Sequence, residues 1–166
     1  VPLMTLLPVV AKEIFAMGST GYSMLMTAQG AGAVAGAFLV ASASFRGGAG
    51  RSAILSGLLF AGALATFSAS RWLPLSAVAA FVAGASLLGV VTTVSSVVQL
   101  ATPEAIRGRV LSIFMLAFRG GMPLGNLLAG WNAERFGVSF ALGVNAIVLG
   151  IVVAGFLVMP NRVREM

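Results

Sequence analysis

The sequence predicts an all-α membrane protein, a bundle of six helices in which the first helix is truncated. Apolar residues make up 59% of the 166 residues and charged residues only 8%, with a mean hydropathy of +1.05. A soluble domain carries about 25% charged residues, so the bilayer must be the solvent for most of this chain. The charges also leave stretches of about 20 apolar residues between them, which is the length that crosses a hydrocarbon layer of about 30 Å.

Charges and turn residues divide the chain into one partial and five full spans. The opening segment, residues 1–11, is too short to cross a membrane and lacks the basic region of a signal peptide. We therefore interpret it as the end of a helix that begins in a longer chain. The full spans are expected at residues 20–44, 52–70, 75–100, 110–131 and 139–159. Short connections make neighbouring helices antiparallel, and residues 1–166 are expected to form a single transmembrane bundle.

Local signals set the expected ends of several helices. Ser19 and Thr20 are candidate N-caps for the second helix, and Ser139 is one for the last. The run Thr102-Pro103-Glu104 offers a cap, a proline for the first helical position and an acid for the positive end of the helix dipole. It therefore predicts the start of the fifth helix. Gly137 predicts the end of that helix, because glycine readily adopts the backbone conformation that closes one.

The inventory of reactive side chains excludes most catalytic and metal chemistry. The chain has no His, Cys or Asp, and its four acids are glutamates at expected helix ends. Zinc, iron–sulfur and haem sites therefore lose their usual ligands, and Ser-His-Asp and Cys-His catalytic systems are excluded. No Gly-rich loop ending in Gly-Lys-Ser/Thr is present. We expect no catalytic residues, no metal site and no cofactor, so the protein is not expected to be an enzyme.

The net charge of +6 is interpreted as a topology signal, because the basic residues lie between apolar spans and form no stripe for nucleic acid. One side of the membrane would carry Arg46, Arg51, Arg107, Arg109, Arg162 and Arg164, and the other would carry Lys12, Arg71 and Arg135. The positive-inside rule then places the larger group and the C-terminus in the cytoplasm. We expect a multi-pass protein of the cell (inner or plasma) membrane, surrounded by the lipid bilayer and without a nucleic-acid partner.

Arg119 is the charged residue that falls inside an expected span. Placing a charge near the bilayer centre costs at least about 2.5 kcal/mol, and no acid within the spans can pair with it. Its partner would be a backbone carbonyl, a water, an anionic substrate or an acid in another part of a longer protein. The alternative is a shifted span, in which the long side chain reaches the membrane interface.

The segment with Gly120, Gly121, Pro123 and Gly125 is expected to interrupt the same helix. Proline removes one backbone hydrogen bond and clashes with the preceding turn. Broken helices mark binding sites in transporters, although kinks that serve only packing are also common. The sequence leaves both interpretations open.

Small and polar residues recur within the spans. The spacing of four at Ala28, Gly32 and Gly36, and again at Gly121 and Gly125, is typical of close helix packing, and it would also let helices slide in a transport cycle. Ser and Thr within spans mostly bond to their own helix. An amide is harder to leave unpaired than a hydroxyl, so Gln29 and Asn126 are stronger candidates for ligand contacts than Thr92 and Thr93.

The run from Thr102 to Gly137 resembles the major facilitator superfamily, and within it the branch of enterobactin-exporter-like and transmembrane secretion effector permeases. It reads Thr-Pro-Glu-Ala-Ile-Arg-Gly-Arg-Val, then Phe-Arg-Gly-Gly-Met-Pro-Leu-Gly, then Glu-Arg-Phe-Gly. Leu6-Leu7-Pro8 resembles the end of the family's seventh helix. Arg46 to Arg51 resembles its loop between helices eight and nine, without the usual Asp. The resemblance implies helices seven to twelve, the C-terminal half of a twelve-helix fold.

The resemblance also implies alternating access, in which two six-helix bundles rock around a central cavity. The implied pathway candidates are Gln29, Thr92, Thr93, Arg119 and Asn126. The implied cytoplasmic gate and loop residues are Arg46, Arg51, Glu104, Arg107 and Arg109. The expected function is efflux of small amphipathic molecules such as drugs or siderophores, with the missing N-terminal six-helix half, a small-molecule substrate and a coupling proton as partners. The alternative is a non-transport membrane scaffold or assembly subunit.

Overall fold

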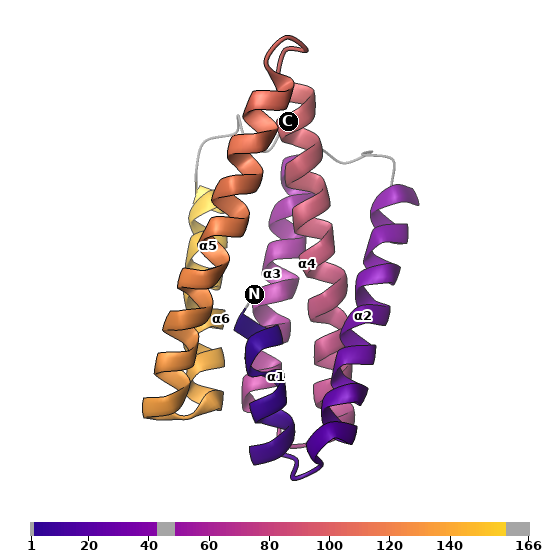
Figure 1. The fold of residues 1–166 in the computed structure, drawn as a ribbon. Coiled ribbons are helices and arrows are strands. Elements are labelled where there is room, and N and C mark those ends of the chain that lie inside the picture. The colour runs from indigo at the N-terminus through magenta and orange to yellow at the C-terminus, as the bar shows by residue number, and fades with distance from the viewer. Residues whose placement is uncertain (1, 43–48, 159–166) are drawn as a thin grey trace.

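The computed structural model describes residues 2–42 and 49–158, and within them the chain forms helices and no strands. The helices are α1 (Pro2–Glu13), α2 (Gly18–Ser42), α3 (Ala49–Ala69), α4 (Leu73–Ala101), α5 (Arg107–Phe136) and α6 (Val138–Val158). In the described part of the chain, α2 to α6 are long and apolar enough to cross a membrane. The prediction of an all-α membrane bundle is therefore confirmed (Figure 1).

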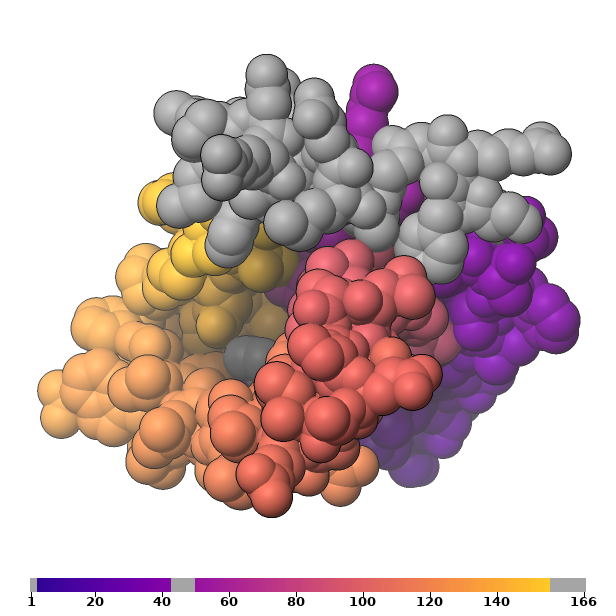
Figure 2. Space-filling model, turned by 90° about the horizontal axis from the view of Figure 1, so that it is seen from above, coloured from indigo at the N-terminus to yellow at the C-terminus, as the bar shows by residue number. Residues whose placement is uncertain are grey.

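The helices run up and down side by side, with α3 and α4 at the centre of the bundle (Figure 1). α4 packs against α2 and α3, and α3 packs against α6 on its other side. α5 packs mainly against α6 and α1 and only briefly against α4. Seen along the bundle, α5 and α6 lie on one side and α2 lies on the opposite side (Figure 2).

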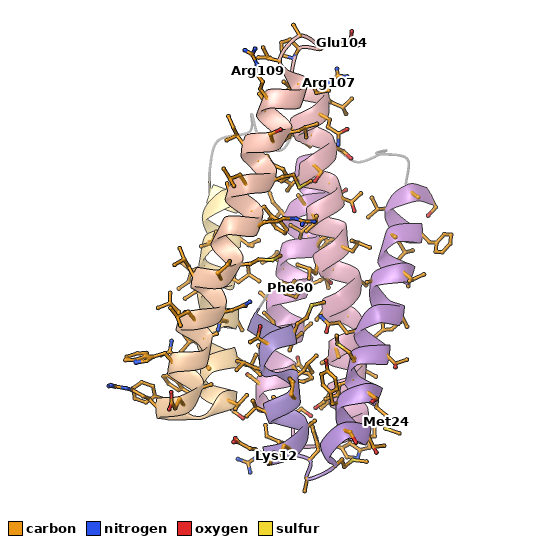
Figure 3. The ribbon with its side chains drawn as sticks, in the orientation of Figure 1. Lys12, Met24, Phe60, Glu104, Arg107 and Arg109 are labelled. Carbon is orange, nitrogen blue, oxygen red and sulfur yellow. The ribbon has the colours of Figure 1, made fainter. Side chains whose placement is uncertain are left out.

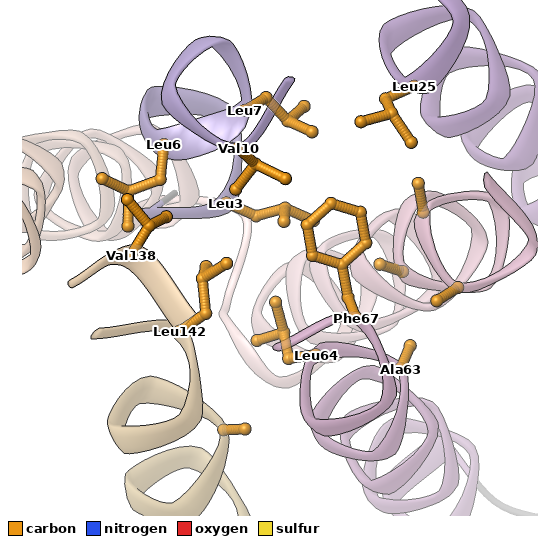
Figure 4. Packing of buried hydrophobic residues seen from close by; sticks show 14 of the residues in the cluster. Leu3, Leu6, Leu7, Val10, Leu25, Ala63, Leu64, Phe67, Val138 and Leu142 are labelled. Atoms are coloured by element: carbon orange, nitrogen blue, oxygen red, sulfur yellow. The ribbon is translucent and has the colours of Figure 1, made fainter. Parts of the chain in front are cut away.

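The short helix α1 lies at one end of the bundle (Figure 1), and its buried side chains point toward those of the neighbouring helices (Figure 4). Leu3, Leu7 and Val10 of α1 are at most 2% exposed. They belong to one buried cluster with Leu25 of α2, Leu64 and Phe67 of α3, and Val138 and Leu142 of α6. Lipid tails are as apolar as these side chains, so close van der Waals packing is what favours this contact in a membrane.

The parallel helices α2 and α4 meet backbone to backbone at their glycines. A Cβ atom at Gly32 would overlap the carbonyl group of Phe81, and one at Gly84 would overlap that of Gln29. Gly36 continues the same contact one turn further along α2. Only hydrogen fits at these positions, so the packing interpretation of the glycine spacing in α2 is confirmed.

The same spacing in α5 has a different environment. A Cβ atom at Gly121 or Gly125 would have no neighbour within 4 Å outside its own helix turn. Ala129 is the single buried residue of α5. The glycine face of α5 therefore makes no close helix contact within the described residues.

Hydrogen bonds to the Ser70 side chain stabilise the turn between α3 and α4. The Ser76 hydroxyl is fully buried and donates to Ser70 Oγ at 2.9 Å, and Ser70 Oγ in turn donates to the Trp72 carbonyl at 3.1 Å. The Trp72 N–H donates back to Ser70 Oγ at 3.3 Å. The Trp72 side chain is 67% exposed, as suits an indole at a membrane interface.

The expected start of the fifth helix at Thr102 is wrong. Thr102 is the residue that closes α4, and its hydroxyl donates to the Val98 carbonyl at 2.6 Å. A threonine hydroxyl can either bond a carbonyl in the preceding helical turn or cap a following helix. Thr102 bonds the preceding turn. The next residues make a turn, with the Ile106 N–H donating to the Pro103 carbonyl at 3.2 Å, and α5 begins at Arg107.

The other expected N-caps are also wrong, by two or three residues. α2 begins at Gly18, so Ser19 and Thr20 lie inside it, and α6 begins at Val138, so Ser139 does too. The predicted end at Gly137 is confirmed. This glycine has φ of 87°, and its N–H donates to the Ala133 carbonyl at 2.9 Å. Because Gly137 turns the chain within one residue, α6 needs no separate capping residue.

The expected interruption at residues 120–125 is also wrong. α5 is helical from Arg107 to Phe136, with Pro123 inside it. The proline removes one N–H donor from a helix of 30 residues. Neighbouring backbone bonds and local adjustments accommodate such a proline in membrane helices, so the helix continues through it.

Candidate substrate pathway

Gln29 is the buried amide of α2 that the sequence singled out. Its side chain is 2% exposed, and both Nε2 and Oε1 lack a hydrogen-bond partner among the described residues. Its backbone carbonyl lies against Gly84 at the α2–α4 crossing. A buried polar group without a partner costs about 1–3 kcal/mol, so an unpaired amide at this depth calls for a partner such as a water or a ligand.

Arg119 and Asn126 share one face of α5. Seven residues separate them, which is two turns of helix with an offset of about 20°. Asn126 is half-buried, and its Oδ1 is buried without a partner. Arg119 is exposed and forms no ion pair with any residue in the described ranges. This face thus combines a permanent positive charge with an unpaired carbonyl oxygen.

The spacing of the other charges along α5 constrains the depth of Arg119 in a membrane. Arg119 lies about 15 Å from Arg109 and about 23 Å from Glu134 at 1.5 Å per residue. If the helix shifted so that Arg119 reached an interface about 15 Å from the bilayer centre, Glu134 would enter the hydrocarbon to about 8 Å from that centre. The shifted-span alternative therefore replaces one buried charge with another, so the other charges of α5 are compatible with a mid-membrane Arg119, which stays a prediction.

Thr92 and Thr93 lie nearer the C-terminal end of α4 than Gly84, where α4 crosses α2 at Gln29. Thr93 is 1% exposed and Thr92 is half-buried. Thr93 is nine residues beyond Gly84, or about 14 Å further along the helix. No hydrogen bond joins any two of the five pathway candidates within the described chain. They occupy successive depths of the bundle and do not form a compact cluster.

A family model described as transmembrane secretion effector matches residues 1–166. The chain belongs to this family of the major facilitator superfamily. The match confirms the resemblance carried by the run from Thr102 to Gly137 and supports a transport role for this multi-pass membrane protein. Neither a curated protein nor a solved structure matches the chain.

The gate residues expected for this family gather at one end of the bundle. Glu104, Arg107 and Arg109 lie at the turn between α4 and α5 (Figure 3). The Arg107 side chain is half-buried and donates from a terminal nitrogen to the Thr102 carbonyl at 3.5 Å, while its Nε is buried without a partner. Arg51 is exposed near the start of α3 at the same end, and Arg46 lies outside the described residues.

The charge difference between the two ends rests largely on residues outside the described ranges. Among the described residues, each end of the bundle carries three of these basic residues: Arg51, Arg107 and Arg109 at one end, and Lys12, Arg71 and Arg135 at the other. The excess that favours a cytoplasmic C-terminus comes from Arg46, Arg162 and Arg164. The orientation therefore stays a prediction.

Two further polar features were not singled out as sites by the sequence. The Asn145 side chain bonds the backbone of its own helix, α6, because its Nδ2 donates to the Ala141 carbonyl at 2.7 Å. A small cavity at the end opposite the gate residues brings Glu13 and Arg71 together from separate connections. No spacing or motif links these two residues, so only the folded arrangement reveals their common cavity.

Proposed function

We propose that the chain is part of a secondary active transporter that exports small amphipathic molecules, such as drugs or siderophores, by alternating access. The observation that carries this proposal is the face with Arg119 and the unpaired Oδ1 of Asn126 on α5, a helix long and apolar enough to cross a membrane. The family match and the membrane-crossing helices support it. A scaffold has no use for unpaired polar groups inside the bilayer, whereas a transporter needs them to bind its substrate.

The polar candidates favour a substrate with a specific chemistry. The planar guanidinium of Arg119 presents donors that suit a carboxylate or phosphate. The amides of Gln29 and Asn126 offer both donors and acceptors. The surrounding residues of α5 are large and apolar, with Leu116 and Leu127 more than 70% exposed. We therefore propose an amphipathic substrate that carries an anionic group and enters a largely apolar pathway.

We further propose that the exposed face of α5 meets a second six-helix bundle, the N-terminal half implied by the family. Gly120, Gly121 and Gly125 have open space where a partner helix could approach closely. The glutamates in the described part of the chain, Glu13, Glu104 and Glu134, lie at or near helix ends. If a proton drives transport, the acid that carries it would belong to that other bundle. The proposed location is the cell membrane with the C-terminus in the cytoplasm.

The test uses Arg119→Ala and Asn126→Ala in the full-length protein, with Arg135→Ala as the matched control. Arg135 lies over the Trp131 ring at 4.6 Å near the end of α5, outside the proposed pathway. Efflux of a fluorescent anionic amphiphile from cells is measured beside the amount of protein in the membrane. We expect Arg119→Ala to lower efflux more than tenfold at unchanged expression, and Arg135→Ala to keep it. Unchanged efflux in Arg119→Ala and Asn126→Ala would remove both residues from the proposed site, and no efflux above background from the wild-type protein would favour the scaffold alternative.

A further inference from the structure

Three chain connections at the end of the bundle opposite the gate residues line an open cavity of about 250 Å³. They are the end of α1, the α3–α4 turn and the α5–α6 turn. The volume is slightly below the roughly 300 Å³ at which sites for drug-sized ligands begin. The cavity therefore suits a ligand of headgroup size. Phe136 is 17 residues from Arg119 on α5, about 26 Å away, so the cavity is separate from the proposed pathway.

The cavity holds two opposite charges that do not pair with each other. Glu13 and Arg71 both line it, and neither forms an ion pair with a residue that the structure describes. They come from different parts of the chain, Glu13 from the end of α1 and Arg71 from the α3–α4 turn. Glu13 is also the last residue of α1, where the helix dipole is negative and disfavours a carboxylate. A ligand cation beside Glu13 would relieve this repulsion.

Other residues that line the cavity suit an anion. Arg71 faces the same cavity as the first turn of α6, including Ser139. The first amides of α6 precede its first backbone bond, in which the Ala141 N–H donates to the Gly137 carbonyl at 3.1 Å. Free amides at the start of a helix stabilise an anion. They act here in addition to the guanidinium and the Ser139 hydroxyl.

Aromatic side chains complete the cavity. The rings of Phe136 and Phe140 have their centroids 5.2 Å apart at an interplanar angle of 47°. They are 58% and 51% exposed, so they remain available to a ligand. The face of an aromatic ring attracts a cation within about 6 Å, and its apolar surface suits the carbon atoms next to a charged group.

We propose that this cavity binds a zwitterionic group, with a primary ammonium beside Glu13 and an oxyanion beside Arg71 and the start of α6. The shared chemistry is an ammonium joined to a phosphate or carboxylate by a short linker. A phosphatidylethanolamine headgroup and a free zwitterionic solute both carry it. The cavity lies at a helix end where a headgroup would be found, and it also opens to a soluble ligand.

The experiment places the full-length protein in vesicles that contain equal amounts of phosphatidylethanolamine, phosphatidylcholine and phosphatidylglycerol. The protein is then purified, and the lipids that remain bound are measured by native mass spectrometry. Soluble phosphoethanolamine is added in a second arm as a competitor. The variants are Glu13→Gln and Arg71→Gln. Lys12→Gln is the matched control, because Lys12 is an exposed charge at the same end and does not line the cavity.

We expect the wild-type protein to retain phosphatidylethanolamine at least fivefold over the other two lipids. Glu13→Gln and Arg71→Gln should each lose this preference, and Lys12→Gln should keep it. Displacement by soluble phosphoethanolamine would identify a site that free solutes also enter, and persistence of the lipid would identify a headgroup site. Equal retention of the three lipids by the wild type, with no binding of soluble phosphoethanolamine, would overturn the proposal even if the variants fail to fold. A preference that survives in both cavity variants would overturn it too.

Discussion

A single methyl group at Gly32 tests whether the α2–α4 contact is as close as the structure indicates. In Gly32→Ala the new Cβ would overlap the Phe81 carbonyl group, which is backbone and cannot rotate away. The two helices must therefore separate. The matched control is Gly30→Ala, two residues away on α2, where a Cβ would have nothing within 4 Å.

The expected magnitude follows from two opposing effects. Adding atoms to a packed interface costs about 1–3 kcal/mol, and replacing glycine by alanine in a helix gains up to about 1 kcal/mol. With the full gain from alanine, Gly32→Ala should therefore lose up to about 2 kcal/mol of stability. Gly30→Ala has only the favourable effect, so its stability should be unchanged or slightly higher.

Thermal unfolding of the detergent-purified protein, followed by tryptophan fluorescence, measures the difference. At about 2–4 °C per kcal/mol for chains of this size, the midpoint of Gly32→Ala should fall several degrees below that of Gly30→Ala. Equal midpoints for the two variants would refute the backbone contact between α2 and α4. The glycine spacing in α2 would then have no packing role at this crossing.

Three other variants test single features of the structure. Gln29→Leu should leave the unfolding midpoint unchanged or raise it, because it removes an unpaired buried amide. Efflux by this variant should fall. A large loss of stability would show that the amide has a partner. Ser70→Ala should cost about 1–3 kcal/mol in thermal unfolding, because the buried Ser76 hydroxyl loses its acceptor, and a stability equal to wild type would contradict that bond. Gly137→Ala should cost about 1–3 kcal/mol, because φ is 87° and ψ is 157° there, a conformation that is essentially restricted to glycine. A neutral result would mean that this turn differs from the one described.

The sequence was sufficient to predict the helical class, because that prediction depends on where charges are absent. Arg71, Glu104 and Glu134 each mark an interval between apolar stretches, and helices begin or end within a few residues of each. Hydropathy sets such boundaries coarsely. The exact first residue depends on local hydrogen bonds, and Thr102 could serve the helix before it or the one after it. The sequence offers no way to choose between these two bonds.

The candidate site was predicted in part, for a related reason. Buried amides and intramembrane charges are costly, so Gln29, Arg119 and Asn126 can be recognised from the sequence without a fold. Which glycines are packed cannot be recognised that way. Gly32 and Gly121 have the same spacing signal, yet only Gly32 meets another helix in the described chain. The difference arises from tertiary packing, which a local pattern does not contain.

The two kinds of glycine face also indicate which part of the bundle can move. The α2–α4 pair is held backbone to backbone, so separating it disrupts many close contacts, and Gln29 is fixed at that crossing. α5 has one buried residue and little contact with α4, so it can tilt at small cost. Arg119 and Asn126 move with α5. We therefore expect a tilt of α5 to change the separation between its polar face and the amide of Gln29, which would couple helix movement to substrate binding.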